Sequence, residues 1–179
     1  MVYILLAPGF EEAEALVPAD LLRRAKIETA LVSLTGEPVP GSHGITVTAD
    51  LTLEDAEVSK ADMVVLPGGG PGFKNLGKDP RVEQLVREAA EKGLWVAAIC
   101  AAPTLLGKWG LLTGKQAVCY PGMEDGLAGA QVRAASGVVV DGKIITGRAA
   151  GSVFDFGLAL VEALAGKEEA DKVRHGIHY

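Results

Sequence analysis

Cys100 has the setting that most clearly suggests chemistry, because it ends a short apolar run and a proline follows three positions later. Residues 94–99 have the length and composition of a buried strand, and Pro103 is typical of a helix's first turn. A side chain at such a junction projects over the carboxyl ends of a parallel sheet, where open α/β folds bind ligands. The unpaired N–H groups and dipole of the following helix favour an anion there. We therefore predict a nucleophilic cysteine that ionises more readily than a free thiol, whose pKa is about 8.5; a thiol that only fills the core is the alternative.

A second group is the acidic cluster of Glu11, Glu12 and Glu14, near the start of a run with helical spacing. Acidic residues stabilise helix N-termini, and this explains Glu11 and Glu12 without a functional role. Glu14 differs, because Val17 and Pro18 follow it at spacings that share one side of a helix. We therefore expect the Glu14 carboxyl to face inward.

A glycine-rich loop at 67–72 follows the predicted strand 63–66. It lacks the Gly-Lys-Ser/Thr ending of a phosphate loop, and Phe73 stands where a dinucleotide-binding motif has its third glycine. Both phosphate-binding interpretations therefore fail. The glycines still allow the backbone to approach a bound group closely, so that an N–H group there can stabilise an oxyanion.

The two cysteines, Cys100 and Cys119, have neither a Cys-x-x-Cys nor a metal-ligand spacing, so we expect no disulfide framework, metal or cofactor. Cys119 lies in a predicted strand at 116–120 and is interpreted as core packing, with a secondary redox site as the alternative. His43 falls in a predicted loop and is interpreted as solvated, while His175 and His178 lie near the end of the chain.

Strands and helices alternate along the chain and must position these residues. Continuous apolar runs indicate buried strands, and an Asp-Gly pair between two such runs indicates a hairpin. The predicted strands are 2–7, 27–34, 63–66, 94–99 and 116–120, with a hairpin at 138–146; the predicted helices are 10–25, 79–92, 103–108, 153–164 and 168–174. Residues 45–49 are predicted to lie outside the main sheet. This order predicts an α/β three-layer sandwich with a mostly parallel, flavodoxin-like sheet, as a single domain over 1–179.

The first helix carries its own expectations. Helical spacing suggests an inward face of Ala13, Leu16, Val17 and Leu21. Pro18 is expected to kink this helix or to split off its first turn, because proline removes one backbone hydrogen bond.

Composition limits the classes of function. The 179 residues are 49% hydrophobic and 22% charged with a net charge of −6, which suits a globular domain. The only basic cluster is Arg23-Arg24, so we expect no nucleic-acid partner. The apolar run at 2–7 is too short to span a membrane and no basic segment precedes it, so we expect a cytoplasmic protein without a membrane partner.

Three motifs together resemble the ThiJ/PfpI family: EEAE at 11–14, LPGG at 66–69 and AAICAAP at 97–103. The resemblance covers essentially the whole chain and implies the class I glutamine amidotransferase-like fold. It matches Cys100 to the family's elbow cysteine, Glu14 to the carboxylic acid that hydrogen-bonds its sulfur, and Gly69 and Ala101 to positions whose N–H groups face the site. A carboxyl close to a thiolate is more stable protonated, because it then donates a hydrogen bond instead of repelling the sulfur.

The chain also departs from family patterns. Deglycase-like members commonly have a histidine where this sequence has Tyr120, and a phenol is a poorer proton shuttle near neutral pH. The peptidase-like branch has a histidine directly after the cysteine, whereas Ala101 stands here, which disfavours a Cys-His peptidase. His43 lies near the position of an arginine that the resemblance places close to the site at a dimer interface. A glutamine amidotransferase is also disfavoured, since the only later histidines are at the tail.

The resemblance implies a cofactor-independent glyoxalase or deglycase that acts on small reactive dicarbonyls, such as methylglyoxal, or on their protein adducts. Cys100 is the expected nucleophile, Glu14 the proton carrier, and Gly69 and Ala101 the oxyanion donors, with Tyr120 and His43 as auxiliary candidates. The alternative is a redox-sensing stress protein or chaperone whose cysteine is oxidised to sulfinic acid. A homodimer is expected from the resemblance and from the small apolar residues of the first helix.

Overall fold

A computed structural model describes residues 1–36 and 38–179 of the chain. Its main sheet has seven strands in the order β10-β11-β7-β6-β1-β2-β5. Neighbouring strands are parallel except the hairpin pair β10 and β11. The strands are β1 Val2–Leu6, β2 Thr29–Ser33, β5 Leu51–Thr52, β6 Met63–Leu66, β7 Trp95–Ile99, β10 Val138–Asp141 and β11 Ile144–Gly147.

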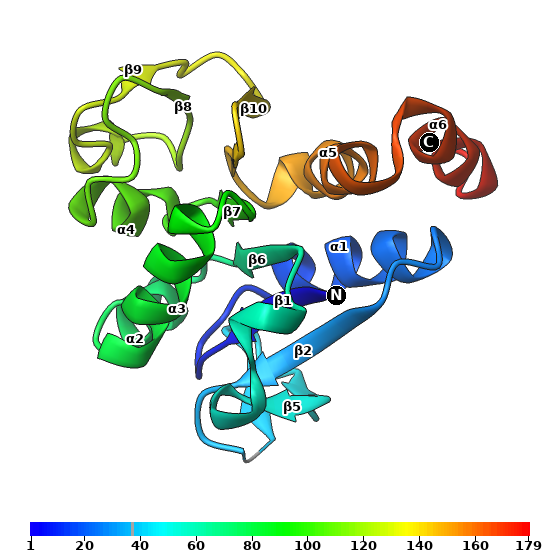
Figure 1. Ribbon diagram of the computed structural model, residues 1–179, viewed down its shortest axis with the longest axis horizontal. Coiled ribbons are helices and arrows are strands. Elements are labelled where there is room, and N and C mark those ends of the chain that lie inside the picture. The colour runs from blue at the N-terminus through cyan, green and yellow to red at the C-terminus, as the bar shows by residue number, and fades with distance from the viewer. Residues whose placement is uncertain (37) are drawn as a thin grey trace.

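Helices cover both faces of this sheet. They are α1 Glu12–Arg24, α2 Gly70–Leu76, α3 Pro80–Glu91, α4 Pro103–Lys108, α5 Val153–Ala165 and α6 Lys167–Gly176. Figure 1 shows α2, α3 and α4 on one side of the strands and α1, α5 and α6 on the other. Two apolar cores fill the two spaces between sheet and helices. The predicted three-layer α/β sandwich with a mostly parallel, flavodoxin-like sheet is therefore confirmed.

Short elements lie outside the main sheet. Strands β3 Val39–Pro40 and β4 Thr46–Val47 pair with each other, as the predicted excursion at 45–49 requires. Strands β8 Gln116–Ala117 and β9 Gln131–Val132 form a second small sheet. Single turns of 3-10 helix occur at Leu53–Asp55, Val58–Lys60, Glu124–Gly126 and Ala150–Ser152. In the described ranges, no helix is long and apolar enough to cross a membrane.

The predicted strand at 116–120 is wrong beyond its first two residues. The Val118 N–H donates to the Thr146 hydroxyl at 3.0 Å, and the Tyr120 N–H donates to the Cys100 carbonyl at 2.7 Å. These bonds take the chain across the carboxyl edge of the main sheet instead of along a strand ladder. The sequence also failed to predict α2, because its glycines and proline indicated only a loop.

Helix α1 is continuous, so Pro18 does not split off its first turn. Its fully buried face includes Ala15, Pro18 and Leu22, whereas the predicted inward residues Ala13, Leu16 and Val17 are only partly buried; Leu21 is buried as expected. Helices α1 and α5 pack closely against each other. Gly157 of α5 has no room for a side chain, since an added Cβ would lie 2.6 Å from Leu21 Cδ1 and 3.2 Å from Pro18 Cα.

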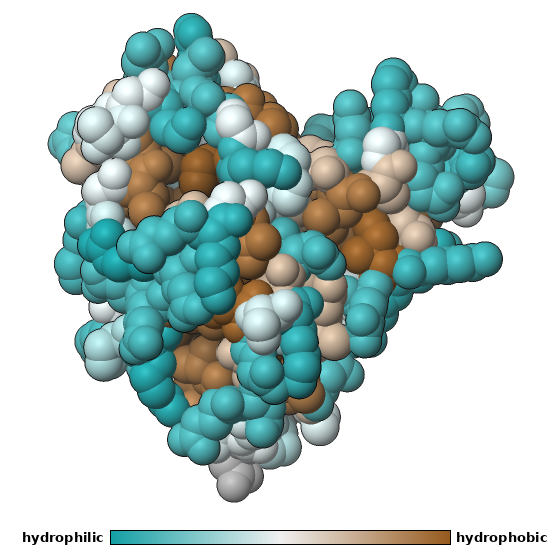
Figure 2. Space-filling model, viewed as in Figure 1, coloured by the Kyte–Doolittle hydropathy of each residue, from teal (hydrophilic) through white to brown (hydrophobic). Residues whose placement is uncertain are grey.

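The surface is mainly hydrophilic on the face drawn in Figure 2, with apolar patches between the elements. The large apolar side chains that are most exposed across the described residues include Ile45, Val140 and Phe154. The Phe154 ring stacks on Tyr179, with ring centroids 5.2 Å apart.

We predict that Gly157→Val lowers the free energy of unfolding by about 1–3 kcal/mol, because the new side chain overpacks the contact between α1 and α5. Urea denaturation measures the change. Gly176→Ala is the matched control, since its methyl group would meet nothing within 4 Å. Equal stability of the two variants would contradict the close packing of α1 on α5.

Candidate functional site

Cys100 directly follows β7 and adopts a left-handed backbone conformation, with φ of +65°. Such a conformation costs a non-glycine residue roughly 1–3 kcal/mol, so the surroundings must hold it. The Cys100 N–H donates to the Gly147 carbonyl at 3.0 Å, while its own carbonyl accepts the Tyr120 N–H. The sharp turn into α4 is thus fixed from both sides, and the thiol is left partly exposed.

The Glu14 side chain is buried, with 1% of its surface exposed, and it faces the same place. Its Oε2 accepts the Gly68 N–H at 2.9 Å. A Cβ added to Gly68 would lie 2.6 Å from that oxygen, 2.7 Å from Cys100 Cβ and 3.1 Å from Cys100 Sγ. The carboxyl and the thiol therefore converge on Gly68, which must lack a side chain for both to fit.

Burial raises the pKa of Glu14 to about 7, although the Cys100 side chain and the Gly68 N–H act to lower it. Among the described residues, the second oxygen of this carboxyl, Oε1, is buried and forms no hydrogen bond. An oxygen without a donor is a suitable place for a proton. Glu14 is therefore able to take up or release a proton near neutral pH.

The expectation that Cys100 ionises more readily than a free thiol is wrong. Burial first, and then the charge and hydrogen bonding of Glu14, raise the pKa of Cys100 to about 12. The Gly69 and Ala101 N–H groups oppose this shift. The sequence argument counted these donors correctly, but it counted neither the burial of the thiol nor the carboxylate beside it.

Gly69 and Ala101 bring their N–H groups to the sulfur from two different loops. Gly69 precedes α2 with φ of +91°, and a Cβ there would lie 2.4 Å from the Gly9 carbonyl oxygen. Only glycine suits both this conformation and this close approach. The glycine-rich loop therefore approaches the reactive groups with its backbone, as the sequence suggested.

Tyr120 reaches Cys100 through its backbone alone. Its side chain is 48% exposed and forms no hydrogen bond to any described residue. The second cysteine, Cys119, is buried, and its thiol lies 3.4 Å from the Tyr120 carbonyl oxygen. Burial raises the pKa of Cys119 to about 11, which agrees with a packing role.

His43 contacts acidic residues at the start of α1 and has no described hydrogen bond to Cys100. Its ring Nδ1 lies 3.0 Å from Glu12 Oε2, and the side chain is 68% exposed. Glu12 is buried, and burial acts to raise its pKa, but hydrogen bonds that include those from His43 and Ile45 lower it to about 2. The sequence argument explained Glu12 only by the helix dipole and did not predict its contact with His43. The polar pair Ser42-His43 was the only indication of such a contact in the sequence.

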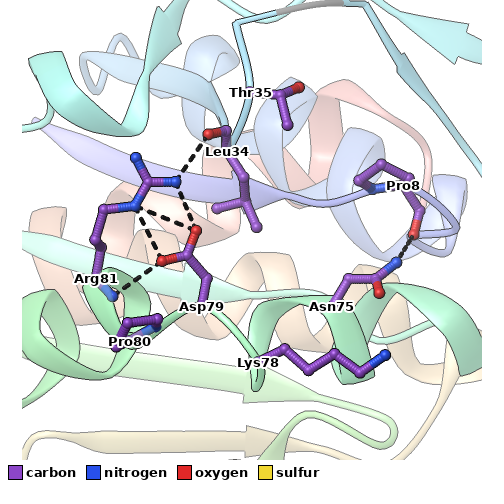
Figure 3. A pocket seen from close by; sticks show the side chains of 8 residues that line it. All are labelled: Pro8, Leu34, Thr35, Asn75, Lys78, Asp79, Pro80 and Arg81. Atoms are coloured by element: carbon purple, nitrogen blue, oxygen red, sulfur yellow. Dashed lines mark hydrogen bonds and ion pairs between the residues drawn. The ribbon is translucent and has the colours of Figure 1, made fainter.

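One cavity, with a volume of about 650 Å³, lies between the ends of β1 and β2 and the start of α3. Figure 3 shows the Arg81 guanidinium bonded to Asp79 and to the Leu34 carbonyl, and Asn75 bonded to the Pro8 carbonyl. Neither Cys100 nor Glu14 lines this cavity, so it is separate from the thiol site.

A parallel α/β sheet with a strained cysteine beyond a central strand, a buried carboxyl and two converging N–H groups defines the class of flavodoxin-like proteins with a nucleophile elbow. The chain belongs to the DJ-1/PfpI family, whose model matches residues 1–163. It is 40% identical over 176 residues to dj-1beta of Drosophila melanogaster, covering 97% of this chain and 94% of that protein. The structure is similar to that of a DJ-1 superfamily protein from Salmonella typhimurium, with a TM-score of 0.94, 36% identity, and coverage of 99% of this chain and 97% of that one.

Two further relatives show how the family varies in length and in the activity that a name states. The chain is 41% identical to DJ-1 homolog B of Arabidopsis thaliana. The matched region covers 96% of this chain but only 40% of that protein. It is 30% identical over 172 residues to a Caenorhabditis elegans protein named glutathione-independent glyoxalase DJR-1.2, covering 95% of this chain and 91% of that protein.

We predict that Gly68→Ala slows alkylation of Cys100 by iodoacetamide and lowers stability by about 1–3 kcal/mol, because the methyl group forces the thiol and carboxyl apart. Peptide mass spectrometry separates Cys100 from Cys119, and thermal unfolding reports the stability. Gly70→Ala is the control, since no atom lies within 4 Å of its added Cβ. If the two variants behave alike, Gly68 does not hold the pair.

We predict that Glu14 makes wild-type stability fall as the pH rises from about 4.5 to about 7. The folded protein binds the Glu14 proton more tightly than the unfolded chain, so the unfolded state is favoured as that proton is lost. Glu14→Gln should therefore gain up to about 3 kcal/mol over wild type across this range. Urea denaturation at pH 5 and pH 8 tests this.

Glu91→Gln is the control for this pH dependence, because Glu91 is exposed and no ion pair holds it among the described residues. Its stability is measured at the same two pH values, for comparison with that of Glu14→Gln. If the stability difference between Glu14→Gln and wild type is the same at both pH values, the pKa of Glu14 is not raised.

Proposed function

We propose that this protein is a cofactor-independent enzyme of the glyoxalase or deglycase type that acts on small dicarbonyls through Cys100. The observation that carries the proposal is the pairing of the Cys100 thiol with a buried carboxyl whose pKa is about 7. General acid–base groups work best when their pKa lies near the working pH. A relative named as a glutathione-independent glyoxalase adds support.

The proposed reaction begins when the Cys100 thiolate attacks the aldehyde carbon of methylglyoxal to form a hemithioacetal. The Gly69 and Ala101 N–H groups donate to the oxygen that becomes negative in this step. Protonated Glu14 gives its proton to that oxygen, and the resulting carboxylate takes a proton from the former aldehyde carbon and returns one to the neighbouring carbon. The hydroxyl proton passes to the neighbouring oxygen, which leaves a thioester. Water cleaves the resulting thioester, which releases lactate and regenerates the thiol, so methylglyoxal and water together give lactate.

Protonation of Glu14 removes a negative charge beside the sulfur and supplies the proton for the first step. A neutral Glu14 no longer repels the sulfur electrostatically, and the two backbone donors oppose the effect of burial on the thiol. The pair thereby keeps one proton available for transfer. The same chemistry on a protein-bound adduct would give a deglycase. The proposal therefore includes both the free dicarbonyl and its protein adduct as substrates.

A second candidate function is a redox sensor or stress chaperone without turnover. The partly exposed thiol and the replacement of the usual histidine by Tyr120 favour it. Peroxide would oxidise Cys100 to sulfinic acid, and a protonated Glu14 would donate a hydrogen bond to an oxygen of that group.

We also propose a cytoplasmic homodimer in which the chain forms one domain over 1–179. Support for the dimer comes from α1, where Ala13, Leu16 and Val17 are only partly buried within the single chain. A second copy would cover such a face.

We predict that wild-type protein forms lactate from methylglyoxal, that Cys100→Ala forms none, and that Glu14→Gln loses at least about a hundredfold in kcat. Chromatography of the product measures the yield. Cys119→Ala should keep wild-type activity, and Tyr120→Phe tests whether the phenol replaces the histidine. No lactate from fully reduced wild type would remove the glyoxalase proposal and favour the redox function.

A further inference from the structure

A buried hydroxyl connects β11 to the backbone of the thiol site. Thr146 lies in β11 beside Ala98 of β7, and none of its surface is exposed. Its Oγ1 accepts the Val118 N–H at 3.0 Å. Val118 is fully buried as well, and its N–H group lies beyond the short ladder of β8 with β9. The Thr146 hydroxyl therefore holds the 118–120 segment against the main sheet in place of a strand ladder.

The other end of the 118–120 segment holds the elbow. The Tyr120 N–H donates to the Cys100 carbonyl at 2.7 Å. That carbonyl and the Ala101 N–H belong to one peptide group, which is planar, so a bond that fixes the oxygen also fixes the direction of the N–H. The Ala101 N–H is one of the donors to the Cys100 sulfur. The segment therefore orients a donor of the site through backbone groups alone.

The next residue of β11 holds the elbow directly. The Gly147 carbonyl accepts the Cys100 N–H at 3.0 Å. A Cβ added to Gly147 would lie 2.8 Å from Ile99 Cγ1 and 2.9 Å from Phe156 Cδ2, so the strand comes this close only without a side chain there. Two adjacent residues of β11 thus control the peptide groups on both sides of Cys100, Gly147 directly and Thr146 through the 118–120 segment.

We propose that Thr146 is a positioning residue of the thiol site. Its hydroxyl, acting through the 118–120 segment, keeps the Ala101 N–H directed at the Cys100 sulfur and at the oxyanion that forms beside it. Thr146 is buried within the single chain, so this role does not depend on a second copy. The part that concerns the oxyanion rests on the proposed function, whereas the effect on the thiol does not.

Loss of this hydroxyl and loss of local stability would change the thiol in opposite directions. Burial and Glu14 raise the pKa of Cys100, and the Ala101 N–H lowers it. If only this donor is lost, less thiolate forms and alkylation becomes slower, because the thiolate is the nucleophile. An elbow that simply opened would expose the thiol and release it from burial, so alkylation would become faster.

The test measures alkylation of Cys100 by iodoacetamide at pH 7 and pH 9, with peptide mass spectrometry, in wild type, Thr146→Val and Thr146→Ser. Valine has the shape of threonine but cannot accept the Val118 N–H, whereas serine can. We expect Thr146→Val to react at least about threefold more slowly at both pH values, and Thr146→Ser to stay within about twofold of wild type.

Thr29→Val is the matched control and should react like wild type. Thr29 begins β2, at the edge of the sheet opposite the thiol, and its hydroxyl donates to the Ile27 carbonyl at 2.9 Å. Alkylation that is unchanged or faster in Thr146→Val would overturn the proposal. A Thr146→Ser variant as slow as Thr146→Val would also overturn it, because the hydroxyl would then not be the group that matters.

Hydrogen exchange in the wild-type protein keeps the proposal falsifiable if Thr146→Val does not fold. The Val118 and Tyr120 N–H groups should exchange as slowly as those of β7, since the proposed connection passes through both. Rapid exchange of either group would overturn the connection.

Turnover separates this inference from the proposed function. In the dicarbonyl reaction, Thr146→Val should lower kcat at least about tenfold and leave KM within about twofold, because an oxyanion donor acts mainly in the transition state. A wild-type kcat in this variant would overturn the role of Thr146. If wild type itself forms no lactate, the glyoxalase proposal fails, and the alkylation rates still decide whether Thr146 positions the thiol site.

Discussion

The burial of one ionisable carboxyl beside a thiol is the constraint on which the rest of this structure depends. Glu14 can lie there only because α1 packs flat on the sheet, Gly68 has no side chain, and the Cys100 backbone takes a left-handed turn. Each feature is unfavourable by itself. The two apolar cores on either side of the sheet supply the stability that holds them together.

The carboxyl and the thiol also share their proton chemistry. Burial and then a charged Glu14 raise the pKa of Cys100, while burial raises the pKa of Glu14 to about 7. The two groups therefore influence each other's titration.

The sequence predicted the parts of the site that follow from local patterns. An apolar run before Cys100 and a proline after it indicated the elbow, and helical spacing indicated an inward Glu14. It did not predict what depends on long-range contacts. The bond from Tyr120 to the Cys100 carbonyl shortens a predicted strand, and the contact of Glu12 with His43 joins residues 31 positions apart. No spacing rule reveals such contacts, because only the folded chain brings the partners together.

The origin of the elbow's hydrogen bonds has a consequence for how the protein is made. Glu14, Gly68, Cys100 and Tyr120 come from separate segments, and the acceptor of the Cys100 N–H is Gly147 of β11. During synthesis on the ribosome, the thiol emerges long before Gly147 does. An incomplete chain that lacks Gly147 therefore lacks the hydrogen bond that holds Cys100 in the elbow. The pairing of the thiol with Glu14 distinguishes the fully folded molecule from such a chain.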